Sequence, residues 1–215
     1  MQSKTIILTS LFFIILLFGL YFFVNNKDSV VELRSVKQSA FIDYPSEYNF
    51  RQTRNDCGPY NTAAVVRAFL KTNVSSTEFS KNISWRLPNN YTLPWGLEKQ
   101  LRENIISIEI PNVKKMSDKD KIVLLQERLS RGRAIIILGG RENYQHYISI
   151  FGFDSAHDQL YIYDSLFKRG ENGSTMDDNG ELPGNVTYSS QELLDFWRAG
   201  GMYGFYTWYA IIAGK

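Results

Sequence analysis

The sequence predicts an α+β protein in which a mainly helical first part precedes an antiparallel sheet, so that two lobes enclose a cleft. Two observations lead to this prediction. Helix start signals and helical periodicity dominate from Cys57 to about residue 130, whereas β-branched and aromatic runs separated by turns follow from Arg133. With 215 residues, of which 44% are hydrophobic, the chain is long enough to bury one core of domain size.

Composition excludes several classes of function. The formal net charge is +2, from 24 basic and 22 acidic residues, and this balance does not favour a nucleic-acid surface. The single cysteine excludes an intramolecular disulfide and a cysteine-rich metal site, and the two histidines, His146 and His157, are too few to favour zinc. We therefore expect no cofactor, no metal and no nucleic-acid partner.

The first 24 residues are predicted to form a transmembrane signal anchor. The run from Thr5 to Val24 is uncharged and almost wholly apolar, which suffices to cross a hydrocarbon core of about 30 Å. It ends in aromatic residues and Asn25 rather than in the small residues of a cleavage site, so an uncleaved single span is expected. Because short N-termini usually stay inside, the domain is placed outside the cytoplasm.

Residues 25–47 are mixed and polar and are predicted to be a stalk or linker, within which Val30–Leu33 is a candidate edge strand. The domain itself is expected over residues 48–215.

The first part of this domain is predicted to be helical with one strand. Cys57 to Leu70 forms an apolar helix, Pro94 begins another because proline fits a first helical turn, and Ser117 begins a third with a capping box. The predicted segments are helices at 57–70, 77–83, 94–103 and from 117 to about 130, with a strand at 105–110.

The second part is predicted to be an antiparallel sheet. Runs at 134–138, 146–153 and 159–164 are strands, the first two separated by Gly139-Gly140 and a polar turn, the last two by a turn that contains His157. A loop rich in glycine, aspartate and asparagine spans 169–185. A capped helix at 189–198 and a final strand at 204–212 follow.

Cys57 is the candidate nucleophile. It stands in Asn55-Asp56-Cys57-Gly58-Pro59, at the start of the apolar helix, where unpaired backbone NH groups and the helix dipole favour a thiolate. A buried structural thiol is the commoner fate of a lone cysteine, but loop-forming neighbours argue against it here. Gly58 is expected to allow a substrate carbonyl to approach closely.

A thiol nucleophile needs a base and a group that orients the base. His146 begins one predicted strand and Asp164 ends the next, so the two positions come roughly opposite each other in an antiparallel pair. Gln52, five residues before Cys57, is a candidate oxyanion donor together with the Cys57 backbone NH. The alternative interpretation of His146 is an ordinary strand histidine, and His157 is expected in solvent.

In this order, Gln52, Cys57-Gly58-Pro59, His146-Tyr147-Ile148-Ser149 and Tyr163-Asp164-Ser165 resemble the papain-like cysteine peptidases of the bacteriocin-processing, double-glycine group. The resemblance covers about residues 48–165 and includes Pro94-Trp95-Gly96-Leu97. It implies a papain-like fold and a Cys-His-Asp triad with a glutamine oxyanion donor.

The sequence departs from that group in two places. Gln52 lies one residue nearer the cysteine than is usual, with Arg51 in the usual place, and Ser165 stands where relatives often carry proline. No ABC module accompanies these motifs, and a separate transporter is kept as a candidate partner.

The leading hypothesis is therefore a membrane-anchored thiol peptidase that hydrolyses a peptide or protein substrate through an acyl-enzyme. Two alternatives stay open. A papain-like acyltransferase would pass the same acyl group to an amine, and an inactive membrane-tethered module would bind a peptide without cutting it.

Overall fold

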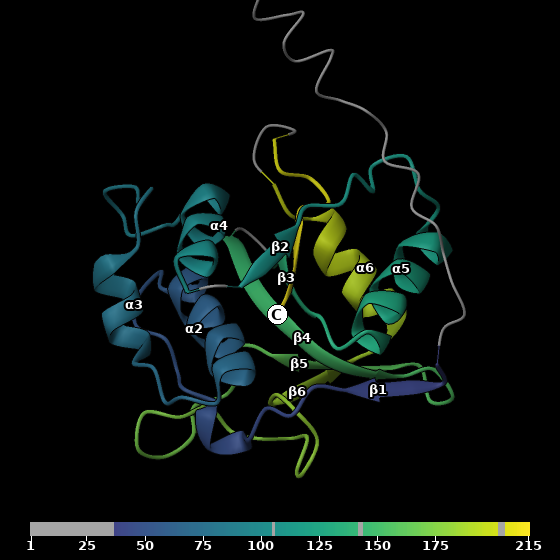
Figure 1. The fold of residues 1–215 in the computed structure, drawn as a ribbon, viewed down its shortest axis with the longest axis horizontal. Coiled ribbons are helices and arrows are strands. Elements are labelled where there is room, and N and C mark those ends of the chain that lie inside the picture. The colour runs from purple at the N-terminus through teal and green to yellow at the C-terminus, as the bar shows by residue number, and fades with distance from the viewer. Residues whose placement is uncertain (1–36, 105, 142–143, 202–204) are drawn as a thin grey trace, which may run out of the picture. The chain divides into compact units, whose positions relative to one another are not determined.

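The computed structural model describes residues 37–104, 106–141, 144–201 and 205–215 (Figure 1). The expected membrane segment Thr5–Val24 and the candidate edge strand Val30–Leu33 lie outside these residues. Within them, no helix combines the length and the apolar character that crossing a bilayer requires.

The α+β class and the antiparallel sheet are confirmed, and the helices begin and end close to the predicted residues. The helical elements are η1 (Ser46–Tyr48), α2 (Cys57–Leu70), α3 (Ser76–Asn82), α4 (Pro94–Glu103), α5 (Asp118–Ser130) and α6 (Ser190–Arg198). The strands are β1 (Ser39–Phe41), β2 (Ser107–Glu109), β3 (Ala134–Arg141), β4 (Tyr144–Asp154), β5 (Gln159–Tyr163), β6 (Val186–Tyr188) and β7 (Ala210–Gly214). β6 was not predicted, and β7 begins later than expected.

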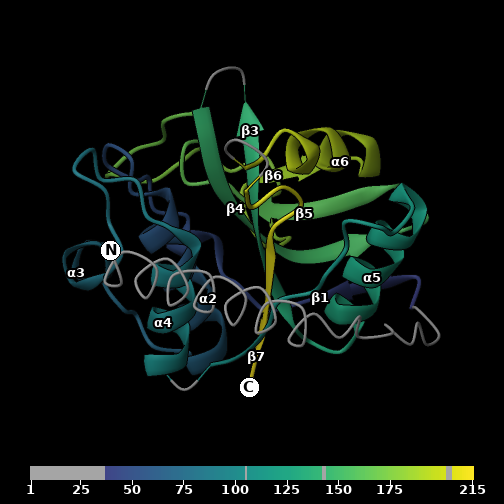
Figure 2. The ribbon, with the colours of Figure 1, turned by 90° about the horizontal axis from the view of Figure 1, so that it is seen from above.

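The described strands form one antiparallel sheet in the order β2-β7-β3-β4-β5-β6. β4 is the longest strand, and it pairs with β3 along its first part and with β5 along its second. Helices α2, α3 and α4 gather on one side of β4, whereas α5 and α6 lie on the other (Figures 1 and 2). The helical first part and the sheet thus meet along β4.

β1 joins the sheet from a part of the chain expected to be a linker. Its residues pair with the last residues of β4, Ala40 opposite Phe153 and Phe41 opposite Gly152. β3 pairs with β4 only as far as Ile150, and β1 pairs with the residues of β4 beyond that point, on the same edge. The sheet therefore includes residues that precede position 48.

Gly139 and Gly140 lie inside β3, which corrects the expectation that they separate two strands. They pair with His146 and Gln145. A Cβ on Gly139 would lie 2.1 Å from the Phe196 ring, and one on Gly140 would lie 2.4 Å from the Ala199 carbonyl oxygen. These glycines are needed because α6 packs directly on the backbone of β3.

One buried asparagine joins α2 to β4. Asn61 is fully buried in a mainly apolar helix. Its amide nitrogen donates to the carbonyl oxygens of Cys57 and Tyr147, each at 2.8 Å, and its Oδ1 accepts from the Ser149 hydroxyl at 2.7 Å. Because buried polar groups cost free energy unless paired, these bonds fix one register of helix on strand.

Replacement of this residue tests that constraint. Asn61→Ala is expected to lower the free energy of unfolding by about 2–3 kcal/mol, because the Tyr147 carbonyl and the Ser149 hydroxyl lose their partner inside the protein. Urea unfolding measures the loss. Thr62→Ala is the matched control: Thr62 is equally buried, but its hydroxyl bonds only within α2, to Gly58. An equal loss in the two variants would contradict the special role of Asn61.

Candidate active site

Cys57 is the first residue of α2 and is almost completely buried. The preceding residue, Asp56, makes no side-chain cap on the helix, so it leaves the first-turn NH groups open. Gly58 has a packing role that the sequence analysis did not predict: a Cβ there would lie 2.9 Å from Leu97 and 3.2 Å from Thr92. Glycine at this position lets α4 and the segment before it pack closely against α2.

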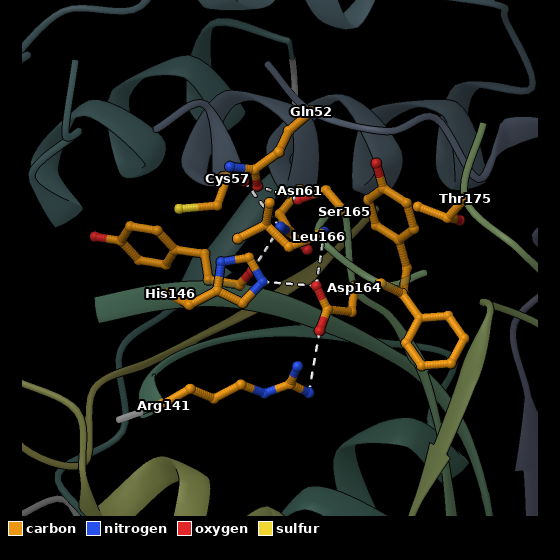
Figure 3. Close-up of polar contacts among 12 residues, drawn as sticks. Gln52, Cys57, Asn61, Arg141, His146, Asp164, Ser165, Leu166 and Thr175 are labelled. Carbon is orange, nitrogen blue, oxygen red and sulfur yellow. Dashed lines mark hydrogen bonds and ion pairs between the residues drawn. The ribbon is translucent and has the colours of Figure 1, made fainter. Parts of the chain in front are cut away.

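His146 and Asp164 come together on the sheet. Ser149 pairs with Tyr163, so the next residue, Asp164, falls opposite Ile148 and diagonal to His146 rather than directly opposite it. The His146 Nε2 lies 2.7 Å from the Asp164 Oδ1 (Figure 3). Only 1% of the His146 surface and none of that of Asp164 is exposed, so little water weakens this contact.

The other ring nitrogen of His146 faces Cys57. In Figure 3 the Nδ1 edge of the imidazole is on the side of the Cys57 sulfur. Apart from the thiol, no described residue is a hydrogen-bond partner of Nδ1, so this nitrogen is free to exchange a proton with the sulfur. The three side chains predicted to form a triad are thus brought together, with the imidazole between the thiol and the carboxylate.

Charge in this cluster favours an imidazolium beside a carboxylate. Burial lowers the pKa of His146, but the Asp164 carboxylate, together with the neighbouring Cys57, raises it from 6.5 to about 9. Burial raises the pKa of Asp164, but the positive charges of His146 and then of Arg141 lower it by more than burial raises it. The pKa of Asp164 is therefore below its usual range. Each group thus stabilises the charged form of the other.

Asp164 is held by the chain on both sides of it. Its Oδ1 accepts a second hydrogen bond from the Leu166 backbone NH at 2.8 Å. The side chain of Asn185 accepts from the Asp164 backbone NH and donates to its carbonyl oxygen, both at 2.9 Å. Asn185 also donates to the Thr175 hydroxyl at 2.5 Å. The loop that follows β5 therefore fixes the position of the carboxylate.

The second carboxylate oxygen of Asp164 faces a residue that the sequence analysis did not single out. The Arg141 guanidinium, at the end of β3, lies 3.2 Å from Oδ2. Arg141 in turn lies over the rings of Tyr188 and Phe196, with its guanidinium carbon 5.5 and 5.9 Å from their centres.

Gln52 is oriented by Ser165. The Ser165 hydroxyl donates to the Gln52 Oε1 at 2.6 Å, and the Gln52 backbone NH donates to the Ser165 carbonyl at 3.0 Å. With its oxygen held in this way, the amide nitrogen of Gln52 points toward Cys57 in Figure 3. Arg51 instead donates to the carbonyl oxygens of Leu166 and Phe167. Position 52, not 51, thus faces the site.

A pocket of about 560 Å³ lies beside the Cys57 thiol. None of its lining residues carries a charged side chain, and aromatic and aliphatic groups dominate. They are Cys57, Leu87, Asn89, Tyr91, Thr92, Leu93, Pro94, Leu138, Tyr144, Gln145, Tyr147, Gly201, Phe205 and Tyr206. Such a lining suits uncharged, apolar ligand groups.

One wall of the pocket is attached to the residues that precede Cys57. The wall is the turn from Leu87 to Leu93. Asp56, just before the cysteine, pairs with the Arg86 guanidinium at 2.5 Å, and Asn55 donates to the Asn89 carbonyl at 2.6 Å. Asp56 and Arg86 are mostly buried, so their pairing is poorly screened. The wall and the nucleophile therefore keep a fixed spacing.

Sequence reasoning missed Asn61, Arg141 and Asn185. A polar residue inside an apolar helix was a usable signal for Asn61, because such a residue needs a buried partner. Arg141 and Asn185 gave no local signal, since their partners are distant in the chain. Among the described residues, no group of three or more His, Cys, Asp and Glu side chains is placed to hold a metal ion.

The sequence matches the Peptidase_C39 like family over residues 37–188, most of the described domain. The chain therefore belongs to this family and is a cysteine peptidase. A comparison with curated protein sequences found no match.

Two solved structures are similar to this chain, and the first agrees with it in fold. The double glycine motif protease from the AMS/PCAT transporter, solved in complex with the leader peptide, is 17% identical with a TM-score of 0.50; the match covers 81% of this chain and 93% of that one. The peptidase domain of Streptococcus ComA, a bi-functional ABC transporter of a quorum sensing pathway, is 19% identical with a TM-score of 0.47; the match covers 80% and 98%.

The paired charges of His146 and Asp164 predict how stability depends on pH. The raised pKa of His146 means that the folded protein holds this proton more tightly than the unfolded chain does. Its contribution is therefore complete below about pH 6.5 and is lost as the pH rises through about 9. The contribution of Asp164, whose pKa is lowered, is present above about pH 4 and is lost on further acidification.

The stability difference between wild type and His146→Gln is thus expected to be largest from about pH 4 to 6.5, a few kcal/mol, and to shrink toward pH 9. Urea unfolding across this range measures it. His157→Gln is the control, because His157 is 71% exposed in its pair with Asp154 and a surface pair contributes about 1 kcal/mol or less. A constant difference for His146→Gln would contradict the prediction.

Proposed function

We propose that this cysteine peptidase cuts peptide bonds with Cys57 as nucleophile, His146 as general base and then acid, and Asp164 as the group that orients His146. The observation that carries the proposal is the buried His146–Asp164 contact at 2.7 Å, with the open Nδ1 edge facing the thiol. A carboxylate on Nε2 leaves Nδ1 as the nitrogen that exchanges a proton with sulfur.

In the first half-reaction the Cys57 sulfur attacks the scissile carbonyl, and its proton passes to the His146 Nδ1. The same proton then goes to the leaving amine as the C–N bond breaks, which leaves a thioester on Cys57. Water attacks the thioester, gives a proton to His146, and releases the acid and the free thiol. The Asp164 carboxylate stabilises the imidazolium that forms in both halves.

Gln52 is proposed as the oxyanion donor, together with the backbone NH of Cys57. The hydroxyl of Ser165 occupies the amide oxygen of Gln52, so the amide NH2 group is the part directed at the thiol. A donor fixed in advance is more effective than one that must reorient during the reaction.

The substrate is proposed to be a peptide with uncharged, apolar side chains near the bond that is cut. The lining of the pocket beside Cys57 supports this, because a buried charge there would lack a partner. The AMS/PCAT transporter protease was solved with a leader peptide, which supports a peptide as substrate here, and its origin in a transporter supports a separate transporter as a candidate partner.

Electrophilic peptides test the mechanism. A peptide aldehyde or vinyl sulfone with apolar side chains is expected to form a covalent adduct at residue 57, detected by mass spectrometry, and an acidic counterpart is expected to label it much more slowly. Cys57→Ala should give neither adduct nor turnover. Selective labelling elsewhere, or full turnover by Cys57→Ala, would contradict the proposal.

The controls separate the roles. Gln52→Ala is expected to lower kcat by about 10²–10³-fold, the usual effect of losing one oxyanion donor, while the adduct at Cys57 still forms. Product analysis decides between water and an amine as acceptor. Binding of a peptide by wild type and Cys57→Ala alike, with turnover by neither, would favour a binding module.

We also propose that Thr5–Val24 anchors the peptidase in a membrane, with the domain outside the cytoplasm. The uncharged apolar run supports this proposal. External protease on intact cells or spheroplasts is expected to cut the domain, whereas a protein lacking residues 1–24 should leave the membrane fraction. A domain that is cut only after lysis would contradict the orientation.

A further inference from the structure

We propose that Arg141 is a positioning residue for the reaction. It keeps the Asp164 carboxylate ionised and oriented so that Oδ1 accepts the hydrogen bond of His146. This inference rests on the proposed function of Cys57, His146 and Asp164. It extends that function to a residue on a different strand, at the opposite side of the carboxylate from the imidazole.

The two carboxylate oxygens have separate partners. Oδ1 accepts from the His146 Nε2 at 2.7 Å and from the Leu166 NH at 2.8 Å. Oδ2 is buried, and among the described residues the ion pair with the Arg141 guanidinium, at 3.2 Å, is its polar contact. A buried carboxylate oxygen without a partner is costly, so Arg141 adds to His146 in keeping Asp164 charged at 0% exposure and is the group that does so at Oδ2.

Arg141 is itself held for this role. Its side chain is 35% exposed, but the rings of Tyr188 from β6 and Phe196 from α6 lie against the guanidinium. Such stacking limits the directions in which a guanidinium can point. Phe196 also contacts the His146 ring edge to face, with centres 6.4 Å apart, so one side chain supports both partners of Asp164.

The charged and titratable groups around Asp164 come from every element packed against it. They are His146 on β4, Arg141 on β3, Cys57 on α2 beyond the imidazole, and Tyr163, the preceding residue on β5, whose hydroxyl donates to the Phe50 carbonyl. Of these, Arg141 is the permanent positive charge. Its loss should therefore raise the pKa of Asp164, so that the carboxylate is protonated at a higher pH.

Kinetics of Arg141→Met test the proposal, because methionine keeps an apolar stem against the two rings and removes the charge. We expect kcat to fall on the order of tenfold or more and the acid limb of the pH–rate profile to move to higher pH. KM should be nearly unchanged, since Arg141 does not line the pocket. Arg141→Lys keeps the positive charge and should restore the acid limb and part of kcat. Arg141→Gln replaces Arg141→Met in this test if the Met variant does not fold.

The matched control is Arg133→Met. Arg133 flanks the other end of β3, is 26% exposed and pairs with Glu109 at 3.6 Å, far from the triad in the sheet. It should leave kcat and the acid limb unchanged. In an Asp164→Asn background, adding Arg141→Met should lower kcat by less than about twofold, because Arg141 acts through the carboxylate that this background lacks.

An unchanged kcat and acid limb in Arg141→Met would overturn the proposal, as would an equal loss with and without Asp164. Absence of Cys57-dependent turnover in wild type would instead overturn the proposed function. The Arg141–Asp164 pair is then tested by acid unfolding, whose midpoint should move to higher pH in Arg141→Met but not in Arg133→Met. No shift there would overturn the pair without reference to activity.

Discussion

The buried amide of Asn61 is the contact on which the geometry of the site depends. It lies one helical turn after Cys57, and it binds the carbonyl oxygens of Cys57 and of Tyr147, the residue that follows His146. One side chain therefore fixes the spacing between α2, which carries Cys57, and β4, which carries His146. The Ser149 hydroxyl donates to the Oδ1 of Asn61, so both ends of the amide have partners in this one arrangement. A shift of α2 along β4 would leave several buried polar groups without a hydrogen bond.

Burial of Asp164 imposes the second constraint. A carboxylate with no exposed surface has to be compensated by charge and by hydrogen bonds. The compensation comes from three parts of the chain: His146 on β4, Arg141 on β3, and the backbone NH of Leu166 just after β5. Asn185, at the far end of the loop after β5, holds the Asp164 backbone in place. The C-terminal part of the domain thus contributes to the site although it supplies none of the predicted reacting groups. Its β6 and α6 place the rings that support Arg141.

The residues just before the cysteine have two tasks. Gln52 points its amide at the thiol because Ser165 occupies its oxygen, and Asp56 gives up the usual capping role in order to bind Arg86 at the edge of the pocket wall. The proposed nucleophile and the proposed oxyanion donor therefore lie on one short segment, which also anchors the pocket wall. Preorganisation of this kind favours the transition state without a cost at the moment of reaction.

The sequence by itself determined the class of fold, the main helices and the central strands, because helix caps, prolines and runs of β-branched residues are local signals. It also singled out Cys57, His146, Asp164 and Gln52, since a lone cysteine at a helix start and a histidine and an aspartate on neighbouring strands form a recognisable order. Only the tertiary structure decided what surrounds them. Gly139 lies in a strand because α6 packs on its backbone, and Arg141 and Asn185 serve Asp164 through contacts between distant segments, which no local pattern encodes.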